Sequence, residues 1–128
     1  DAIYRSHPDI NCVITAQCPN ILAYAVTCTR LDTRTIPESY VLLRDVQMVS
    51  YGTQFERPQQ IAKLLSANSP VILIQNDAVL TTGTTILQAF DRLEVAEATA
   101  KALLDIANIG RRVPIAREEL EELERAFF

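Results

Sequence analysis

Short apolar runs alternate along the chain with longer stretches of helical periodicity. The unbroken apolar run at 71–74 predicts a buried strand, and a turn at 75–77 separates it from a second strand at 78–82. So short a link joins antiparallel strands, because a parallel crossover needs a dozen or more residues. Two further strands are expected at 10–14 and 46–51.

Helices are expected in the remaining periodic stretches. Thr85 and Gln88 have the capping-box spacing that marks the start of a helix, and Gly110 predicts its end in the left-handed conformation. Pro37 and Pro58 suit the first position of a helix, where a missing N–H costs nothing. The alternation of helices and strands predicts a layered α/β domain. The expected helices span 2–6, 20–28, 37–43, 58–66, 86–109 and 117–128.

Composition narrows the class of protein. The 128 residues suffice for one domain, and 48% apolar with 22% charged residues is typical of a globular protein. A net charge of -4 without a Lys/Arg run argues against nucleic acid as a partner, and no apolar stretch is long enough to predict a membrane span. Cys12, Cys18 and Cys28 lack CxxC spacing and fit reduced thiols, so a cytoplasmic protein is expected.

Common catalytic motifs are absent from the sequence, which has no GxGxxG, GxxxxGK[ST], HExxH or GxSxG pattern. Its one histidine, His7, precedes Pro8 in a predicted surface turn, and one histidine cannot build a multi-histidine zinc site. Asp77 stands out because loops between strands commonly carry function, although aspartate is also an ordinary turn former. Glu97 and Lys101 are expected to form an exposed i,i+4 pair.

Three segments together resemble the class II aldolase/adducin family. VILIQNDAVLTTGTTILQAFDRLEVAEATAKALL, at 71–104, resembles the family's strand, Asn-His-Gly, second strand, glycine and helix. AIYRSHPDINCVITAQCP, at 2–19, resembles its Ile-Tyr-x-x-x-Pro-Asp segment followed by Val-x-His-x-His. TIPESY, at 35–40, resembles the segment after the following helix. The three segments keep the family's order and cover nearly the whole chain.

This resemblance implies an α/β fold, an α/β/α layered sandwich with a mainly antiparallel sheet. It also implies a homo-oligomer, usually a tetramer. The chain would be a single domain, 1–128, that corresponds to the C-terminal two-thirds of the usual fold. The family includes sugar-phosphate aldolases and epimerases as well as the adducin head domain. In the enzymes, three histidines hold a divalent metal, commonly zinc, that polarises the substrate's carbonyl.

The positions of those histidines fall at Thr15, Gln17 and Asp77, so all three ligands are replaced. Threonine is a poor zinc ligand, and a glutamine oxygen suits harder cations better than zinc. The resemblance therefore implies a degenerate member with no expected metal or other cofactor. A tyrosine used by some of the aldolases falls within about a residue of Tyr40, and the family's catalytic glutamate lies upstream of the segments present here.

The first functional hypothesis is a non-catalytic domain that acts through self-association or as part of a larger protein. Another hypothesis, which stays open, is a module that binds a phosphorylated small molecule. It would use Thr81, Thr84 and Thr85 near a helix start, where free N–H groups favour anions, although strand and cap roles explain these threonines as well.

The alternative to a non-catalytic domain is an enzyme, a sugar-phosphate aldolase or epimerase with a rebuilt site. Asp77 would act as the base and Tyr40 as the acid, since a carboxylate in a cleft can serve as a base when burial raises its pKa. Thr15, Gln17 and Asn76 would contact the substrate.

Overall fold

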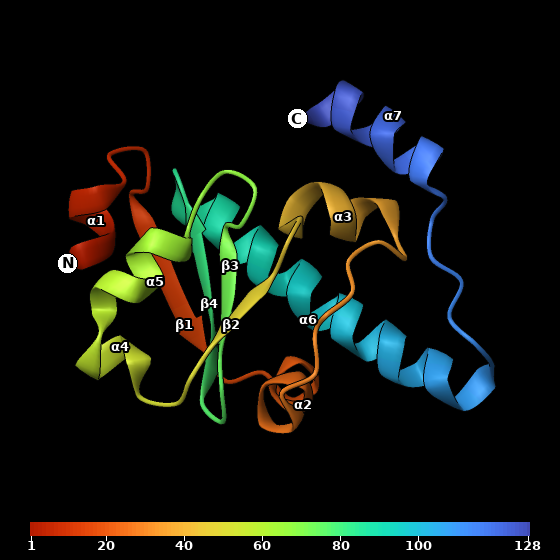
Figure 1. Ribbon diagram of the computed structural model, residues 1–128, viewed down its shortest axis with the longest axis horizontal. Helices are drawn as coiled ribbons and strands as arrows, with labels where there is room; N and C mark the ends of the chain where they lie inside the picture. Colours follow the sequence, from red (N-terminus) through yellow and green to blue (C-terminus); the bar gives the residue numbers. More distant parts are fainter.

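A four-stranded sheet lies between two layers of helices in the computed structural model, which describes residues 1–128 (Figure 1). The order of strands across the sheet is β1-β4-β3-β2. β4 pairs antiparallel with both β1 and β3, whereas β2 runs parallel to β3, so the sheet is mainly antiparallel as expected. The strands are β1 (Cys12–Ala16), β2 (Gln47–Val49), β3 (Val71–Ile74) and β4 (Ala78–Gly83).

Helices cover both faces of this sheet (Figure 1). α2, α3 and α6 pack over one face, and α1 and α5 pack over the other. None of the helices has the length and apolar character needed to cross a membrane. The helices are α1 (Ala2–Ser6), α2 (Pro19–Thr27), α3 (Pro37–Leu43), α4 (Thr53–Glu56), α5 (Pro58–Leu64), α6 (Ile86–Ile109) and α7 (Arg117–Phe127).

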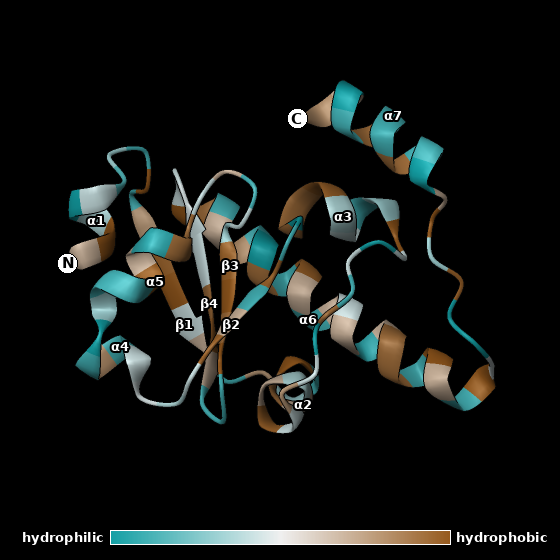
Figure 2. Ribbon diagram, viewed as in Figure 1, coloured by the Kyte–Doolittle hydropathy of each residue, from teal (hydrophilic) through white to brown (hydrophobic).

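The sequence of β3 is apolar without interruption because the strand is buried on both faces of the sheet. Val71 and Leu73 point into the core formed with α2, α3 and α6, whereas Ile72 and Ile74 point into the core formed with α5. All four side chains are fully buried, and Figure 2 shows their apolar character at the centre of the sheet. Burial of each stabilises the fold by about 1.5–3 kcal/mol. A strand covered on both faces cannot show the usual alternation of polar and apolar residues.

The structure confirms some of the predicted ends of helices and strands and corrects others. The Oγ1 of Thr85 accepts a hydrogen bond from the N–H of Gln88, which confirms the cap of α6, but the Gln88 side chain returns to the N–H of Thr84. The first strand ends two residues later than predicted, at Ala16, and α4 was not predicted. Gly110 ends α6 in an extended conformation, with φ -177° and ψ -150°, so the predicted left-handed cap is wrong.

Glu97 does not form the predicted exposed pair with Lys101, which binds Asp105 instead. The Glu97 carboxylate caps α2, and it accepts hydrogen bonds from the backbone N–H groups of Asn20 and Ile21, at 3.2 and 2.8 Å. The amide of Asn20 donates a third bond at 3.0 Å. A carboxylate at a helix N-terminus satisfies free N–H groups and also compensates the helix dipole.

Glu97→Ala is therefore expected to lower the free energy of unfolding by about 3 kcal/mol, since charge-assisted hydrogen bonds are each worth about 1.5–3 kcal/mol and are not additive. Denaturant unfolding followed by circular dichroism measures this loss. Glu94→Ala is the matched control, because Glu94 is exposed on the same helix and has no partner. Equal stability of the two variants would contradict the capping role.

Candidate functional site

Gln17, Gln54 and Asp77 meet at one end of the sheet and are called the Asp77 cluster below. The antiparallel pairing of β1 and β4 sets Ala16 opposite Val79, which brings the residue after β1 beside the β3–β4 turn. The amide of Gln17 donates to Oδ1 of Asp77 at 3.4 Å, and the amide of Gln54, on α4, donates to Oδ2 at 2.5 Å.

The other expected residues of this site lie close by. Thr15 is exposed near the end of β1, two residues before Gln17. Asn76 is also exposed, and its backbone N–H donates to the carbonyl of Ala25 at 3.2 Å. Its φ of 60° lies in the left-handed region, which asparagine tolerates, so Asn76 shapes the turn that presents Asp77.

The residues of the Asp77 cluster do not fit the zinc ion that the resemblance to the family's enzymes implies. Thr15, Gln17 and Asp77 supply one carboxylate and no imidazole, and both oxygens of that carboxylate already accept amide hydrogen bonds. Zinc sites in proteins are built from Cys, His and acidic ligands, usually with three protein ligands where the site is catalytic. No group of three or more His, Cys, Asp or Glu side chains gathers in this chain.

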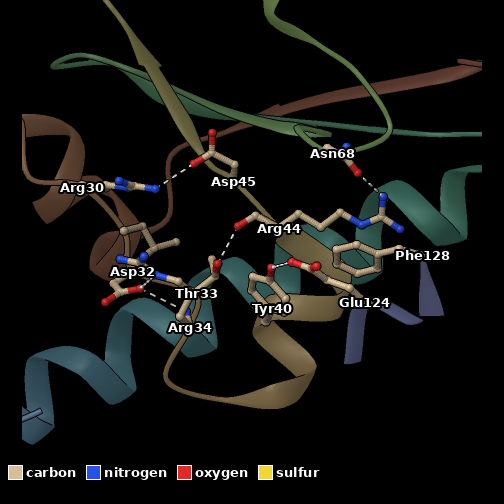
Figure 3. Close-up of a pocket in the computed structure, with 11 residues that line it drawn as sticks. Arg30, Asp32, Thr33, Arg34, Tyr40, Arg44, Asp45, Asn68, Glu124 and Phe128 are labelled. Atoms are coloured by element: carbon tan, nitrogen blue, oxygen red, sulfur yellow. Dashed lines mark hydrogen bonds and ion pairs between the residues drawn. The ribbon is translucent and has the colours of Figure 1, made fainter. Parts of the chain in front are cut away.

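Tyr40 lies in a different place, on α3 and against α7 (Figure 3). Its hydroxyl donates to Oε1 of Glu124 at 2.5 Å, and its ring stacks on Phe128 with centroids 5.6 Å apart. The hydrogen bond to Glu124 and burial raise the pKa of Tyr40, so its proton is held more tightly than usual. α3 leads into the start of β2, beside the start of β3, whereas Asp77 follows the end of β3. The structure therefore does not bring Tyr40 and Asp77 together.

A polar cavity of about 440 Å³ borders Tyr40 (Figure 3). Four of its charged side chains form ion pairs: Arg30 binds Asp45 at 3.0 Å, and Arg34 binds Asp32 at 3.1 Å. The positive and negative charges of these four paired side chains therefore cancel. Arg44 and Glu124 also line the cavity and form no ion pair.

The threonines near the start of α6 have structural roles. Thr81 is buried, and its hydroxyl donates to the carbonyl of Ala89 at 2.9 Å. Thr85 caps the helix through Gln88. Thr84 is exposed, but its hydroxyl donates to the same Gln88 side chain. The sequence placed these residues correctly near a helix start, and their hydroxyls already have protein partners.

His7 and the cysteines have local surroundings that favour structural roles. Nε2 of His7 lies 2.6 Å from the carbonyl of Ala62, which ties the end of α1 to α5. Cys12 and Cys18 are half-buried and Cys28 is exposed. Burial, with the nearby Glu97 carboxylate, raises the pKa of Cys18, and the protonated thiol is not a nucleophile.

The candidate site lies where the end of β1 meets the β3–β4 turn, in an α/β/α sandwich whose fold is that of solved class II aldolases. The family model of the Class II Aldolase and Adducin N-terminal domain matches residues 1–104. The chain therefore belongs to this family.

Individual relatives agree with this assignment. An L-fuculose phosphate aldolase of Methanococcus vannielii is 29% identical over 103 residues, which cover 77% of this chain and 54% of the relative. Human gamma-adducin is 29% identical over 92 residues, which cover 70% of this chain and 13% of that protein. The chain spans about half the length of the aldolase that it matches.

The fold itself is similar to that of solved structures. An L-fuculose 1-phosphate aldolase from Glaciozyma antarctica superposes with a TM-score of 0.80 at 22% identity. The superposition covers 98% of this chain and 47% of that protein. At this identity the likeness establishes the fold, and it leaves the chemistry to be argued from the residues.

The resemblance of the sequence indicated where Gln17 and Asp77 would meet, but it gave no indication of Gln54. α4 is only four residues long and has no apolar period, so no local pattern marks Gln54 as a member of the site.

Proposed function

We propose that this chain is a non-catalytic domain of the class II aldolase/adducin type, which acts through self-association or as part of a larger protein. One observation carries the proposal. The positions that resemble the family's metal ligands hold Thr15, Gln17 and Asp77, and the last two are hydrogen-bonded to each other. The relatives do not decide the question, because an aldolase and an adducin match at the same 29% identity.

The arrangement of the Asp77 cluster supports loss of the chemistry. A general base must reach the substrate's proton with an oxygen, and both oxygens of Asp77 are held by amide donors. The predicted acid, Tyr40, lies on α3 with its hydroxyl bound to Glu124.

Self-association is supported by a surface along the outer side of β1. β1 is an edge strand, so one row of its backbone N–H and C=O groups has no partner strand. Cys12 and Ile14 alternate with Val13, which faces the α1 and α5 layer, and therefore point toward the α6 layer. Ile86, Leu87 and Phe90 of α6 are 72%, 66% and 47% exposed. We call these five residues the β1-edge surface: Cys12, Ile14, Ile86, Leu87 and Phe90.

A second copy of the chain is the occupant we propose for the β1-edge surface. An edge strand can pair with the same strand of another copy, and a two-fold axis then brings the same apolar residues together. Contiguous apolar side chains beside an open strand edge are otherwise a site of uncontrolled aggregation.

The loss of chemistry is tested by assaying cleavage of ketose 1-phosphates with the purified chain, with and without Zn²⁺, Mn²⁺ or Mg²⁺. No turnover and no stoichiometric metal by mass spectrometry are the expected results. The aldolase alternative predicts the opposite, namely turnover that stops in Asp77→Asn and persists in Asp91→Asn, a matched change at an exposed aspartate of α6. That outcome would replace the non-catalytic proposal with the aldolase.

A further inference from the structure

A second polar cavity, of about 180 Å³, lies at the end of β4. Two arginines from different elements line it: Arg44, which follows α3, and Arg92, on α6. Gly83 and Thr84 form another part of its wall. β4 starts beside the Asp77 cluster and ends here, so the length of a six-residue strand, about 20 Å, separates the two places. We call it the Arg44–Arg92 cavity.

Arg92 has a buried hydrogen-bond donor without an acceptor. Its Nη1 donates to the carbonyl of Thr82 at 2.7 Å, but its Nε is buried and has no partner. None of the chain's ion pairs involves Arg92. Buried donors in proteins nearly always have acceptors, so the unpaired Nε leaves Arg92 short of hydrogen-bond partners within the chain.

Arg44 also lacks a carboxylate partner. Its Nη1 donates to the carbonyl of Ala67 and to Oδ1 of Asn68, both at 2.8 Å, and both acceptors are neutral. The backbone of Arg44 has φ 54° and ψ -120°, a conformation that favours glycine. An arginine at such a position retains strain that a glycine would relieve, and strain of this kind accumulates at functional positions.

The charges of the cavity do not balance within the chain. Asp9 is the one carboxylate of its lining, against two guanidinium groups, and it makes no ion pair. His7, also in the lining, contacts the Ala62 carbonyl. Burial, and then repulsion from Arg44, lower the pKa of Arg92, yet a guanidinium stays charged in proteins. The lining therefore carries one more positive than negative charge, and the Arg44 guanidinium also lies 3.7 Å from the centroid of the Phe128 ring.

We propose that the Arg44–Arg92 cavity binds a small oxyanion, with a phosphate group as the best match. Guanidinium groups present planar pairs of N–H donors that fit phosphate oxygens, and a bound anion offsets the repulsion between the two arginines. A cavity of about 180 Å³ has room for a phosphate group. This site is independent of the proposed self-association and of the Asp77 cluster.

Titration with inorganic phosphate tests the site. The melting temperature of the chain is followed while chloride keeps the ionic strength constant, and a saturable rise is expected. Arg44→Gly and Arg92→Gln should each weaken binding about tenfold or more, because a charge-assisted hydrogen bond is worth about 1.5–3 kcal/mol. Arg57→Gln is the matched control: Arg57 is exposed, forms no ion pair and lies outside the cavity, so its variant should bind like the natural chain.

The choice of Arg44→Gly separates binding from folding. Glycine adopts the backbone conformation of residue 44 without strain, so this variant keeps the fold, as circular dichroism would verify. Glycerol 3-phosphate in place of inorganic phosphate shows whether free phosphate or a phosphate ester is preferred. The absence of a saturable rise with both compounds, or unchanged binding by either arginine variant, would overturn the proposal.

Discussion

The combined substitutions Thr15→His, Gln17→His and Asp77→His are expected to raise retained zinc from none to about one ion per chain. Position 17 already contacts position 77, and position 15 lies two residues earlier, near the end of β1. Three imidazoles at these positions would supply a tetrahedral zinc with three ligands and leave the fourth position open. Metal analysis of the purified variant after dialysis, with the natural chain beside it, measures the gain.

Gln54 gives a further reason to expect this gain. Its amide nitrogen donates to residue 77, while its Oε1 is buried and has no hydrogen-bond partner. Histidines that bind metals usually donate their second ring N–H to an oxygen, which fixes the orientation of the ring. An acceptor without a donor, beside the position of a family histidine, is consistent with a site that has lost its ligands and kept their surroundings.

The control for this prediction keeps Thr15→His and Gln17→His but carries Asp77→Ala. This control has two imidazoles, and its zinc affinity should be more than about tenfold lower than that of the triple variant. Removing only the hydrogen-bond partner of a metal ligand already costs about tenfold, and removing the ligand itself should cost more. A folded triple variant that binds no better than this control would show that the replaced positions do not converge on one ion. The Asp77 cluster would then be a simple turn contact.

The sequence predicted best the parts of the fold that depend on local patterns. The buried run of β3, its tight turn and the start of α6 at Thr85 followed from apolar runs and capping chemistry. Glu97 was assigned to the wrong partner because its true partners lie on α2, more than 70 residues away along the chain. Local spacing favours a neighbour four residues on and carries no information about such a distant helix end.

Some residues of the candidate site could also be predicted from the sequence, and others could not. Gln17 and Asp77 were predictable because the resemblance supplied both positions, and their contact follows from the pairing of β1 with β4. The place of Tyr40 depends on how α7 folds back on α3, which no strand or helix pattern encodes. Arg44 could not be recognised either, since its unusual backbone and its neutral partners appear only once the chain is folded.

Ile86→Glu and Leu87→Glu together are expected to raise the dissociation constant for self-association by at least about 100-fold. Burial of two large apolar side chains stabilises an interface by about 3 kcal/mol, and each 1.4 kcal/mol is a factor of ten. Both residues lie in the first turn of α6, where a carboxylate interacts favourably with the helix dipole, so the substitutions should not weaken the fold. Sedimentation equilibrium of the natural and substituted chains measures the change.

The matched control is Ile109→Glu with Val113→Glu. These residues are 87% and 82% exposed, so they are equally apolar and even more accessible, but they lie outside the β1-edge surface. The control should associate as the natural chain does, because loss of exposed apolar area elsewhere does not affect a specific interface. Equal weakening by both pairs would indicate non-specific association, and a folded natural chain that stays monomeric at every concentration would exclude the β1-edge interface altogether.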